Sequence, residues 1–183
     1  MTVPMLTTPR LVLRPLTIDD AGDIQRLFPH WEIVRHMTRR IPWPYPKEGA
    51  LNFLQHAALP AMASGNAWFW SIRRREADGQ LIGVINLSLG SADNRGFWLA
   101  REWQRQGLMS EACYAVTEYW FNVLGQERLQ VSKAAANAAS RRLSEKTGMR
   151  LVATERRDYV GGSMDTEIWS ITRAEWNAGP GRR

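Results

Sequence analysis

The chain has 183 residues, of which 44% are hydrophobic and 23% are charged. This is the size and composition of one soluble domain with a core of its own. No run approaches the roughly 18 apolar residues of a membrane-spanning helix, which excludes an integral membrane protein. The formal net charge of +6 suits a polyanionic partner, whether RNA, an acidic protein or a phosphorylated cofactor, but the arginines are spread along the chain as on a plain solvated surface.

Cysteine and histidine usage points to an intracellular protein without a metal. Cys113 is the single cysteine, so it cannot form an internal disulfide, and residues 1–16 lack the apolar stretch of a secretory signal. We therefore expect a cytoplasmic location. His30, His36 and His56 are too scattered for metal-ligand spacing, so we expect no metal site.

The first third of the chain predicts one strand and two helices. Leucines in residues 11–16 indicate an extended segment, and two aspartates open a helix over residues 19–28 with apolar positions at helical spacing. The prolines of residues 41–46 exclude a helix there and predict a stiff loop that carries two aromatic residues. A second helix is expected over residues 47–63.

The middle of the chain predicts a meander of three strands. The strands are expected over residues 68–73, 81–87 and 96–100. The pair Asp78-Gly79 is a hairpin signal between the first two strands, and residues 91–94 form the next turn.

The last third predicts two helices, a strand and a hairpin. Residues 110–124 carry one apolar stripe and form the clearest helix; a strand at 129–132 and a helix at 138–146 follow. Residues 151–156 and 166–171 then pair as a hairpin. This order predicts a mixed α/β sheet with helices on its faces. We expect one domain over residues 1–176 and a flexible tail over residues 177–183.

The junction between the strand at 96–100 and the long helix predicts an anion site. Backbone N–H groups at a helix N-terminus are unpaired and carry partial positive charge. Gly107 would let the chain approach a phosphate closely, and Gln104 and Arg105 add donors. The alternative is that Gly107 is only a turn residue and Ser110 only a helix N-cap.

Four motifs resemble the GNAT superfamily of N-acetyltransferases, and they occur along the chain in the order and spacing typical of that superfamily. Residues 104–108 (QRQGL) resemble its Q/R-x-x-G-x-G/A coenzyme loop, although Met109 replaces the last small residue. Other segments are similar to the Rim-type branch, which comprises the ribosomal-protein N-terminal acetyltransferases and their relatives. They are Met109 followed by Ser-Glu-Ala, residues 8–14 (TPRLVLR), residues 137–149 (NAASRRLSEKTGM), and the hairpin with Gly161-Gly162 and Asp165. The resemblance covers residues 8–172.

The resemblance implies a fold and an acetyl-coenzyme A site. The expected fold is a mostly antiparallel sheet of six to seven strands, splayed at its centre, with helices on both faces. Pantetheine would lie in the gap between residues 96–100 and 129–132. The implied coenzyme-binding residues are Trp98, Leu99, Ala100, Gln104, Arg105, Gln106, Gly107, Leu108, Met109, Ser110, Asn137 and Ser140. An alternative role for Asn137 is to cap the following helix.

The resemblance also implies direct transfer of the acetyl group to an amine, without an acyl-enzyme. A backbone N–H at Leu99–Ala100 would stabilise the oxyanion. Many members carry a tyrosine where this chain has Ser144, so Ser140, one turn earlier, is the preferred partner of the leaving thiolate. Glu102 is the candidate base, and Glu32, His36 and a water relay are alternatives. Ser140 could instead be only a small helix residue, and Glu102, Glu32 and His36 could be only solvated surface residues. We interpret Cys113 as a small core residue and not as a nucleophile.

The acceptor is the least defined partner. The expected acceptor wall consists of Trp31, His36, Trp43 and Tyr45, although these aromatic residues could instead pack helices onto the sheet. A protein or peptide N-terminal α-amine is preferred. The alternatives are a small amine, such as an amino sugar, polyamine or antibiotic, and a non-catalytic acetyl-CoA-binding or RNA-associated module. We expect no membrane partner, nucleic acid only through a ribosomal substrate, and either a monomer or a homodimer.

Overall fold

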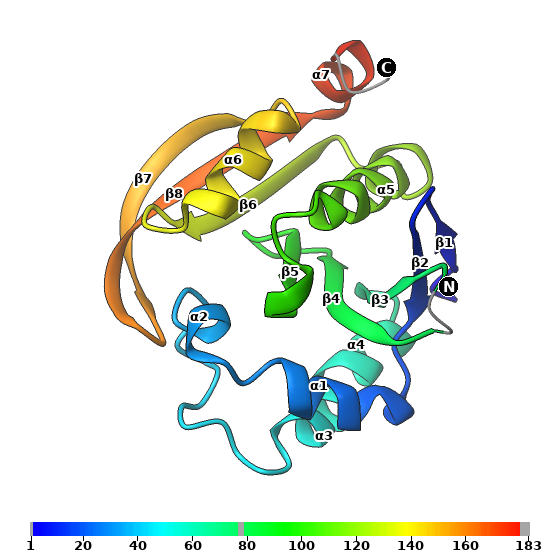
Figure 1. Ribbon diagram of the computed structural model, residues 1–183. Helices are drawn as coiled ribbons and strands as arrows, with labels where there is room; N and C mark the ends of the chain where they lie inside the picture. Colours follow the sequence, from blue (N-terminus) through cyan, green and yellow to red (C-terminus); the bar gives the residue numbers. More distant parts are fainter. Residues whose placement is uncertain (1, 77–78, 180–183) are drawn as a thin grey trace.

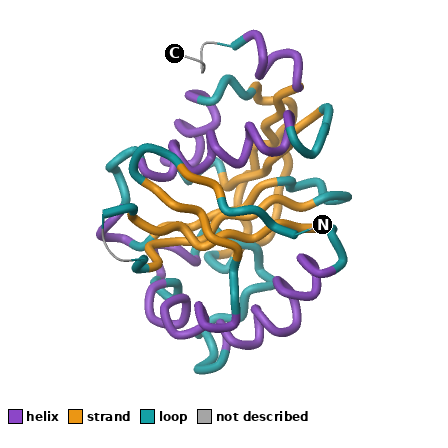
Figure 2. Tube along the Cα trace, turned by 90° about the vertical axis from the view of Figure 1, so that its right-hand side faces the viewer, coloured by secondary structure: helices purple, strands orange, loops and turns teal. Residues whose placement is uncertain are grey.

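The computed structural model describes residues 2–76 and 79–179 and consists of two antiparallel sheets with helices on both faces (Figures 1 and 2). The first sheet has five strands in sequence order and the second has three, in the order β6-β8-β7. The strands are β1 (Leu6–Thr7), β2 (Leu11–Pro15), β3 (Ala67–Arg74), β4 (Leu81–Ser88), β5 (Arg95–Leu99), β6 (Arg128–Ala134), β7 (Arg150–Tyr159) and β8 (Gly162–Thr172).

The helices form two layers that enclose the sheets (Figure 2). The short helices between β2 and β3 cover one face, and the longer helices that follow β5 and β6 cover the other. The first group comprises η1 (Ile18–Asp20), α1 (Ala21–Leu27), α2 (Trp31–Val34), α3 (Gly49–Phe53), the π-helical turn η2 (Leu54–Ala58) and α4 (Leu59–Ala63). The second comprises α5 (Leu108–Asn122), α6 (Ala138–Lys146) and α7 (Arg173–Ala178), and the short turn η3 (Arg101–Trp103) connects β5 to the loop before α5.

Each helical layer has a hydrophobic core beneath it. Alternate residues of β2 and β3, including Leu11, Leu13 and Trp70, pack against the apolar stripe of α5. Trp120 of α5 is 2% exposed, and its indole N–H donates to the Arg128 carbonyl oxygen at 2.9 Å. This bond fixes α5 against the start of β6, so the helix is anchored to both sheets.

The two sheets separate between β5 and β6. Where the two strands begin, the Asn94 N–H donates to the Gln130 carbonyl oxygen and the Gln130 N–H donates to Asn94 Oδ1, both at 2.8 Å. Toward Leu99 and Ala134 they no longer pair, and each strand belongs to a different sheet (Figure 1). One edge of β5 therefore faces a gap rather than a neighbouring strand, which confirms the predicted central splay.

The order and type of the predicted elements are confirmed, with differences at the edges. The sheet has eight strands in two parts rather than six to seven in one, among the described residues. The long helix begins at Leu108, two residues before the predicted start, because Gly107 and not Ser110 is its N-cap. The predicted hairpin signal falls partly on Asp78, which lies outside the described residues.

The C-terminal segment differs from the expected tail. Helix α7 contains Asn177 and ends at Ala178, so part of the segment predicted as a flexible tail is helical. A capping box begins this helix: the Thr172 side chain accepts from the Glu175 N–H, and the Glu175 carboxylate accepts from the Thr172 N–H. In the described part of the chain, no helix is long and apolar enough to cross a membrane.

Candidate active site

The loop between β5 and α5 is braced by its own glutamines. The Gln104 side-chain amide donates to the Leu99 carbonyl oxygen, and that of Gln106 donates to the Glu102 carbonyl oxygen, both at 2.9 Å. The Gln104 bond ties the loop to the end of β5 and so sets its path. The Gln104 amide nitrogen carries two N–H groups, so its role as a donor to the anion site stays a prediction.

Two residues of this loop have a left-handed backbone. Arg105 has a φ of 62° and Gly107 a φ of 76°, conformations that turn the chain sharply into α5. A side chain at Gly107 would be strained by this φ, and its Cβ would lie 3.4 Å from a guanidinium nitrogen of Arg10. Arg105 tolerates the same region at an energetic cost of about 1–2 kcal/mol.

The first turn of α5 presents backbone donors to the loop. The first intrahelical bond runs from the Glu111 N–H to the Gly107 carbonyl oxygen at 3.1 Å. The N–H groups of Leu108, Met109 and Ser110 precede it and so have no acceptor within the helix. Leu108 is buried, and Met109 packs against the core, so their side chains leave the backbone as the exposed binding surface. This geometry fits a phosphate or pyrophosphate.

A clasp from the first strand segment holds this helix terminus. Glu111 accepts hydrogen bonds from the Thr8 hydroxyl at 2.5 Å and from Arg10 Nε at 2.7 Å, and Arg10 also donates to the Gln106 carbonyl oxygen at 3.0 Å. Burial alone would raise the pKa of Glu111, but these hydrogen bonds outweigh it and hold the pKa below its ordinary value. The TPR sequence at residues 8–10 thus acts by locking the loop and α5 together.

The free edge of β5 presents backbone groups to the gap, and its end is the part nearest the α5 loop. The Ala100 N–H donates to the Ile82 carbonyl oxygen of the β4 segment at 2.8 Å, so it is not available to a ligand. Because partners alternate along an antiparallel pair, the Leu99 N–H points away from β4. The Leu99 carbonyl, which accepts from Gln104, points the same way. Trp98 has its side chain on the α1 side, where its ring lies 5.3 Å from that of Phe28.

The opposite wall of the gap is formed by β6 and α6. Asn137 caps α6, since its side chain accepts from the Ser140 N–H at 3.2 Å. Ser140 is partly buried, and its carbonyl oxygen accepts from Lys133 Nζ at 3.3 Å. Lys133 also bonds to the hydroxyl of Ser144, which is fully buried.

Lys133 is a buried basic residue beneath α6 that the sequence reasoning did not single out. It is only 6% exposed, and burial together with the nearby charge of Arg95 lowers its pKa from 10.5 to about 7. The alternation of Leu129, Val131 and Lys133 along β6 could have revealed it, because it places the lysine on the buried face of the strand.

The predicted acceptor residues fall into two groups. Trp31 and Trp43 are 44% and 41% exposed, and their ring centres lie 5.7 Å apart. An ion pair of 3.5 Å between Glu32 and Arg101 brings α2 beside η3, so this aromatic pair is close to the end of β5. Tyr45 instead packs edge-on against Phe28, within the core under α1.

His36 and Glu102 take different positions around this region. His36 is partly buried where residues 35–38 meet the β7–β8 hairpin: the Gly161 N–H donates to the Arg35 carbonyl oxygen at 3.0 Å. Burial, and then the charge of Arg35, lower the pKa of His36. Glu102 is exposed in η3, next to Arg101. Glu102 and Trp31 thus adjoin the two members of the Arg101–Glu32 ion pair, which links η3 to α2.

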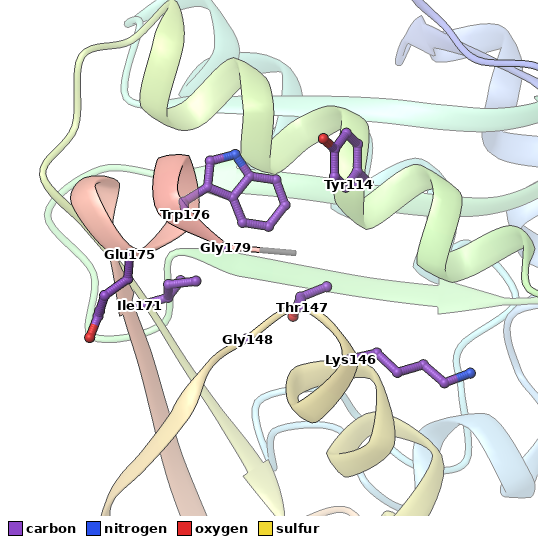
Figure 3. Close-up of a pocket in the computed structure, with 8 residues that line it drawn as sticks. All are labelled: Tyr114, Lys146, Thr147, Gly148, Ile171, Glu175, Trp176 and Gly179. Carbon is purple, nitrogen blue, oxygen red and sulfur yellow. The ribbon is translucent and has the colours of Figure 1, made fainter. Parts of the chain in front are cut away.

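A small cavity lies away from these residues. It is enclosed by α5, the end of α6, β8 and α7, and its volume is about 60 Å³ (Figure 3). Tyr114 and Trp176 line it with ring centres 5.0 Å apart. It is too small for a coenzyme, and none of the predicted site residues lines it. Among the described residues, no group of three or more His, Cys, Asp or Glu side chains could hold a metal ion.

Comparison with known proteins identifies both the fold and the family. The N-acetyltransferase YoaA of Bacillus subtilis (strain 168), itself uncharacterized, is 32% identical over 177 residues, covering 93% of this chain and 97% of that protein. The ribosomal L7/L12 alpha-N-protein acetyltransferase RimL, solved in complex with coenzyme A, superposes with a TM-score of 0.79 at 16% identity, covering 92% of this chain and 98% of that one. The ribosomal-protein-S5-alanine acetyltransferase of Vibrio fischeri superposes with a TM-score of 0.79 at 16% identity, covering 94% of this chain and 98% of that one.

The family model described as the acetyltransferase (GNAT) domain matches residues 10–150, which include Arg10 and Glu111 of the clasp, the α5 loop, and the strands β5 and β6 on either side of the gap. This chain therefore belongs to the GNAT acetyltransferase family.

Proposed function

We propose that this protein moves an acetyl group from acetyl-coenzyme A directly to a primary amine, and that the amine is a protein or peptide N-terminus. The observation that carries the coenzyme part is the left-handed turn at Arg105 and Gly107, which leads into the unpaired N–H groups of α5 beside the free edge of β5. Family membership supports the same activity.

Different residues around the gap bind different parts of the coenzyme. The N–H groups of Leu108, Met109 and Ser110 hold the pyrophosphate, with Arg105 in the turn before them. The β5 edge at Leu99 makes sheet-like contacts with the pantetheine arm, and Asn137 and Ser140 contact it from the α6 side. Acetyl-coenzyme A supplies an activated thioester, so the protein needs no nucleophile of its own.

The transfer reaction then requires a hydrogen-bond donor for the developing oxyanion and an acceptor for the amine proton. The Leu99 N–H is the proposed donor to the developing oxyanion, because the Ala100 N–H is already bonded to Ile82. Glu102 is exposed beside the acceptor side and receives the amine proton through water. Cys113 is fully buried, and burial raises the pKa of its thiol, which suits a core residue rather than a nucleophile.

The preference for a peptide amine is supported by the exposed surface around Trp31 and Trp43. Two tryptophan rings at the end of β5 offer an apolar contact for the first side chains of a peptide. Arg35 and Arg40 are exposed nearby and favour acidic residues further along that peptide. The name of the RimL structure, an alpha-N-protein acetyltransferase, favours the same class of acceptor. A small cationic amine would instead be repelled by this arginine-rich surface.

An acceptor screen tests the proposal. Acetyl-coenzyme A would be incubated with α-amine peptides of acidic, neutral and basic sequence, with the same peptides N-terminally blocked, and with polyamines and amino sugars. Thiol release and the product mass would both be measured. We expect turnover with unblocked acidic peptides and an apparent KM that rises with salt, since exposed charge pairs are screened. Efficient acetylation of small amines without any peptide product would contradict the peptide preference.

A further inference from the structure

Lys133 occupies an unusual place for a lysine. The chain uses arginine for nearly all of its basic residues, and its lysines are Lys47, Lys133 and Lys146. Lys47 and Lys146 are exposed, whereas Lys133 points from β6 into the space beneath α6 and is 6% exposed. Arginine cannot lose its proton at physiological pH, but a buried lysine can. The one buried lysine is thus a basic side chain that can exchange a proton.

Its surroundings hold it in a single orientation. Nζ donates to the Ser140 carbonyl oxygen at 3.3 Å and to the Ser144 hydroxyl, both on α6. The ammonium lies 5.6 Å from the centre of the Trp169 ring on β8. The strand that carries Lys133 borders the gap between the two sheets, opposite the free edge of β5. Lys133 is therefore fixed beneath α6, on a strand that borders the gap, and not on the outer surface.

The carboxylates nearest to Lys133, those of Asp93 and Glu167, act on it from beyond ion-pair distance. Arg95 of β5 is 5% exposed and bonds to the Thr117 hydroxyl at 2.7 Å. Within the described part of the chain, neither Arg95 nor Lys133 forms an ion pair. Glu167, the cross-strand neighbour of Lys133, already accepts from the Trp169 indole at 3.0 Å and pairs with Arg141 at 3.1 Å. Buried positive charge without a contact ion pair is unfavourable, and a ligand that develops negative charge here would stabilise it.

We propose that Lys133 is the proton donor to the sulfur of the coenzyme as it leaves, an inference that rests on the proposed acetyl transfer. When the carbon–sulfur bond of the tetrahedral intermediate breaks, its electron pair stays on sulfur. The Lys133 ammonium gives one proton to that sulfur and becomes a neutral amine. The acceptor nitrogen loses its own proton through water to Glu102, which passes it to solvent, and solvent returns one proton to Lys133, so the products are an amide and a free thiol.

This assignment fits the electrostatics at neutral pH. A general acid works best when its pKa lies near the working pH, and burial and Arg95 bring the pKa of Lys133 to about 7. The ionisable or charged groups that face it lie on four elements, namely Arg95 and Asp93 at β5, Cys113 on α5, Glu167 on β8 and Arg141 on α6. Ser140 remains a contact to the coenzyme arm, and its carbonyl and the Ser144 hydroxyl orient the lysine.

A titration by nuclear magnetic resonance tests the inference without turnover. With lysine-selective carbon labelling the few lysine signals are resolved, and Lys47 and Lys146 serve as internal references. The Lys133 signal should titrate with a midpoint of about 7. Coenzyme A should raise this midpoint by about one unit more than desulfo-coenzyme A, which lacks the sulfur, because a neighbouring thiolate favours the ammonium form. Equal effects of the two ligands would overturn the inference.

Kinetics of three variants supply the second test. Lys133→Met should lower kcat by about 100-fold, within the usual range for loss of a general acid, and change the KM for acetyl-coenzyme A little. Lys133→Arg keeps the charge but cannot release the proton, so its kcat should fall similarly. Lys47→Met is the matched control and should behave as wild type. The alkaline decline of wild-type kcat, as Lys133 loses its proton, should vanish in Lys133→Met.

The outcomes separate this inference from the proposed function. If coenzyme binds and amine is acetylated, but Lys133→Arg keeps full kcat in a folded protein, the lysine acts only as a fixed charge and the proton donor lies elsewhere. If neither coenzyme A nor its desulfo analogue binds, the proposed function fails and this inference fails with it. Melting temperatures of the variants show whether a lost kcat reflects lost folding, and Lys133→Gln provides a smaller polar substitute for that comparison.

Discussion

The proposed coenzyme side and the proposed acceptor side of this molecule are built in different ways. On the coenzyme side, backbone groups form the surface, and the Thr8–Arg10–Glu111 clasp holds them. On the acceptor side, the surface consists of the exposed side chains of Trp31 and Trp43 on a short helix and a proline-containing loop. A backbone site needs a glycine and a helix start at fixed positions, whereas a side-chain site can change its chemistry without changing the fold. The coenzyme-binding site can therefore be predicted from the sequence, whereas the acceptor site can be predicted much less well.

Gly107→Val should produce the largest effect, a loss of coenzyme affinity that leaves the acceptor side unchanged. The valine would be strained at a φ of 76° and would displace the N–H groups at the start of α5. Loss of one or two charge-assisted hydrogen bonds predicts at least about 100-fold weaker coenzyme affinity, measured by calorimetry.

Gly125→Val is the matched control for this substitution. Gly125 has a φ of 65° and open space around its Cβ position, at the far end of α5. It should lower the melting temperature by a similar amount and leave coenzyme affinity unchanged. Equal losses of affinity in both variants would mean that backbone strain, and not the position of the phosphate site, explains the result.

Lys133→Met should stabilise the protein while it removes activity. The pKa of Lys133 is about 7 in the folded chain against 10.5 for a free lysine, so the unfolded chain binds more protons between these values. Wild-type stability should therefore rise with pH from about 7 to about 10.5. At pH 6 the variant should gain on the order of 2–4 kcal/mol, seen as a higher melting temperature.

This stability difference has its own internal check. The advantage of Lys133→Met should shrink as the pH approaches 10, because removing the lysine proton on folding costs less free energy the nearer the pH lies to 10.5, the pKa in the unfolded chain. A constant difference from pH 6 to pH 10 would contradict a buried, titrating lysine on this wall of the gap.

Trp43→Ala tests the acceptor side. Truncation of an exposed anchor residue should raise the KM for a peptide acceptor about 10-fold, while the KM for acetyl-coenzyme A stays the same. Because the two rings contact each other, Trp31→Ala and the double variant should be non-additive. Additive effects, or an equal change in both KM values, would place the peptide elsewhere.

Glu111→Gln should give the smallest effect and sharpen the role of the clasp. The carboxylate accepts bonds from Thr8 and Arg10, so its loss should cost about 1 kcal/mol of stability and weaken coenzyme binding a few-fold. The folded pKa of Glu111 is lowered, so its contribution is present above its ordinary value of 4.5 and is lost as the pH falls below it. The difference in melting temperature from wild type should thus close on acidification, whereas exposed Glu48→Gln should show no difference at any pH.

The same contrast explains what could be predicted from the sequence. Helix α6 was predicted with its observed ends, because Asn137 and Gly148 are strong start and stop signals. Helix α7 was missed because it is only six residues long and is followed by glycine and proline, although Thr172 and Glu175 mark its start. Lys133 was missed because a lysine in a strand is usually solvated, and only the packing of α6 onto β6 shows that it is buried. Tyr45 was assigned to the acceptor wall, yet the structure packs it on Phe28.

Titration of the intact chain with acetyl-coenzyme A, followed by calorimetry and by the melting temperature, tests the central claim most directly. A ligand that binds only the folded state at 100 times its Kd stabilises it by about 2.7 kcal/mol, which corresponds to a rise of several degrees. We predict one binding site per chain with such a rise, both of them lost in Gly107→Val and kept in Gly125→Val. No binding heat and no change in melting temperature at millimolar acetyl-coenzyme A would contradict the account.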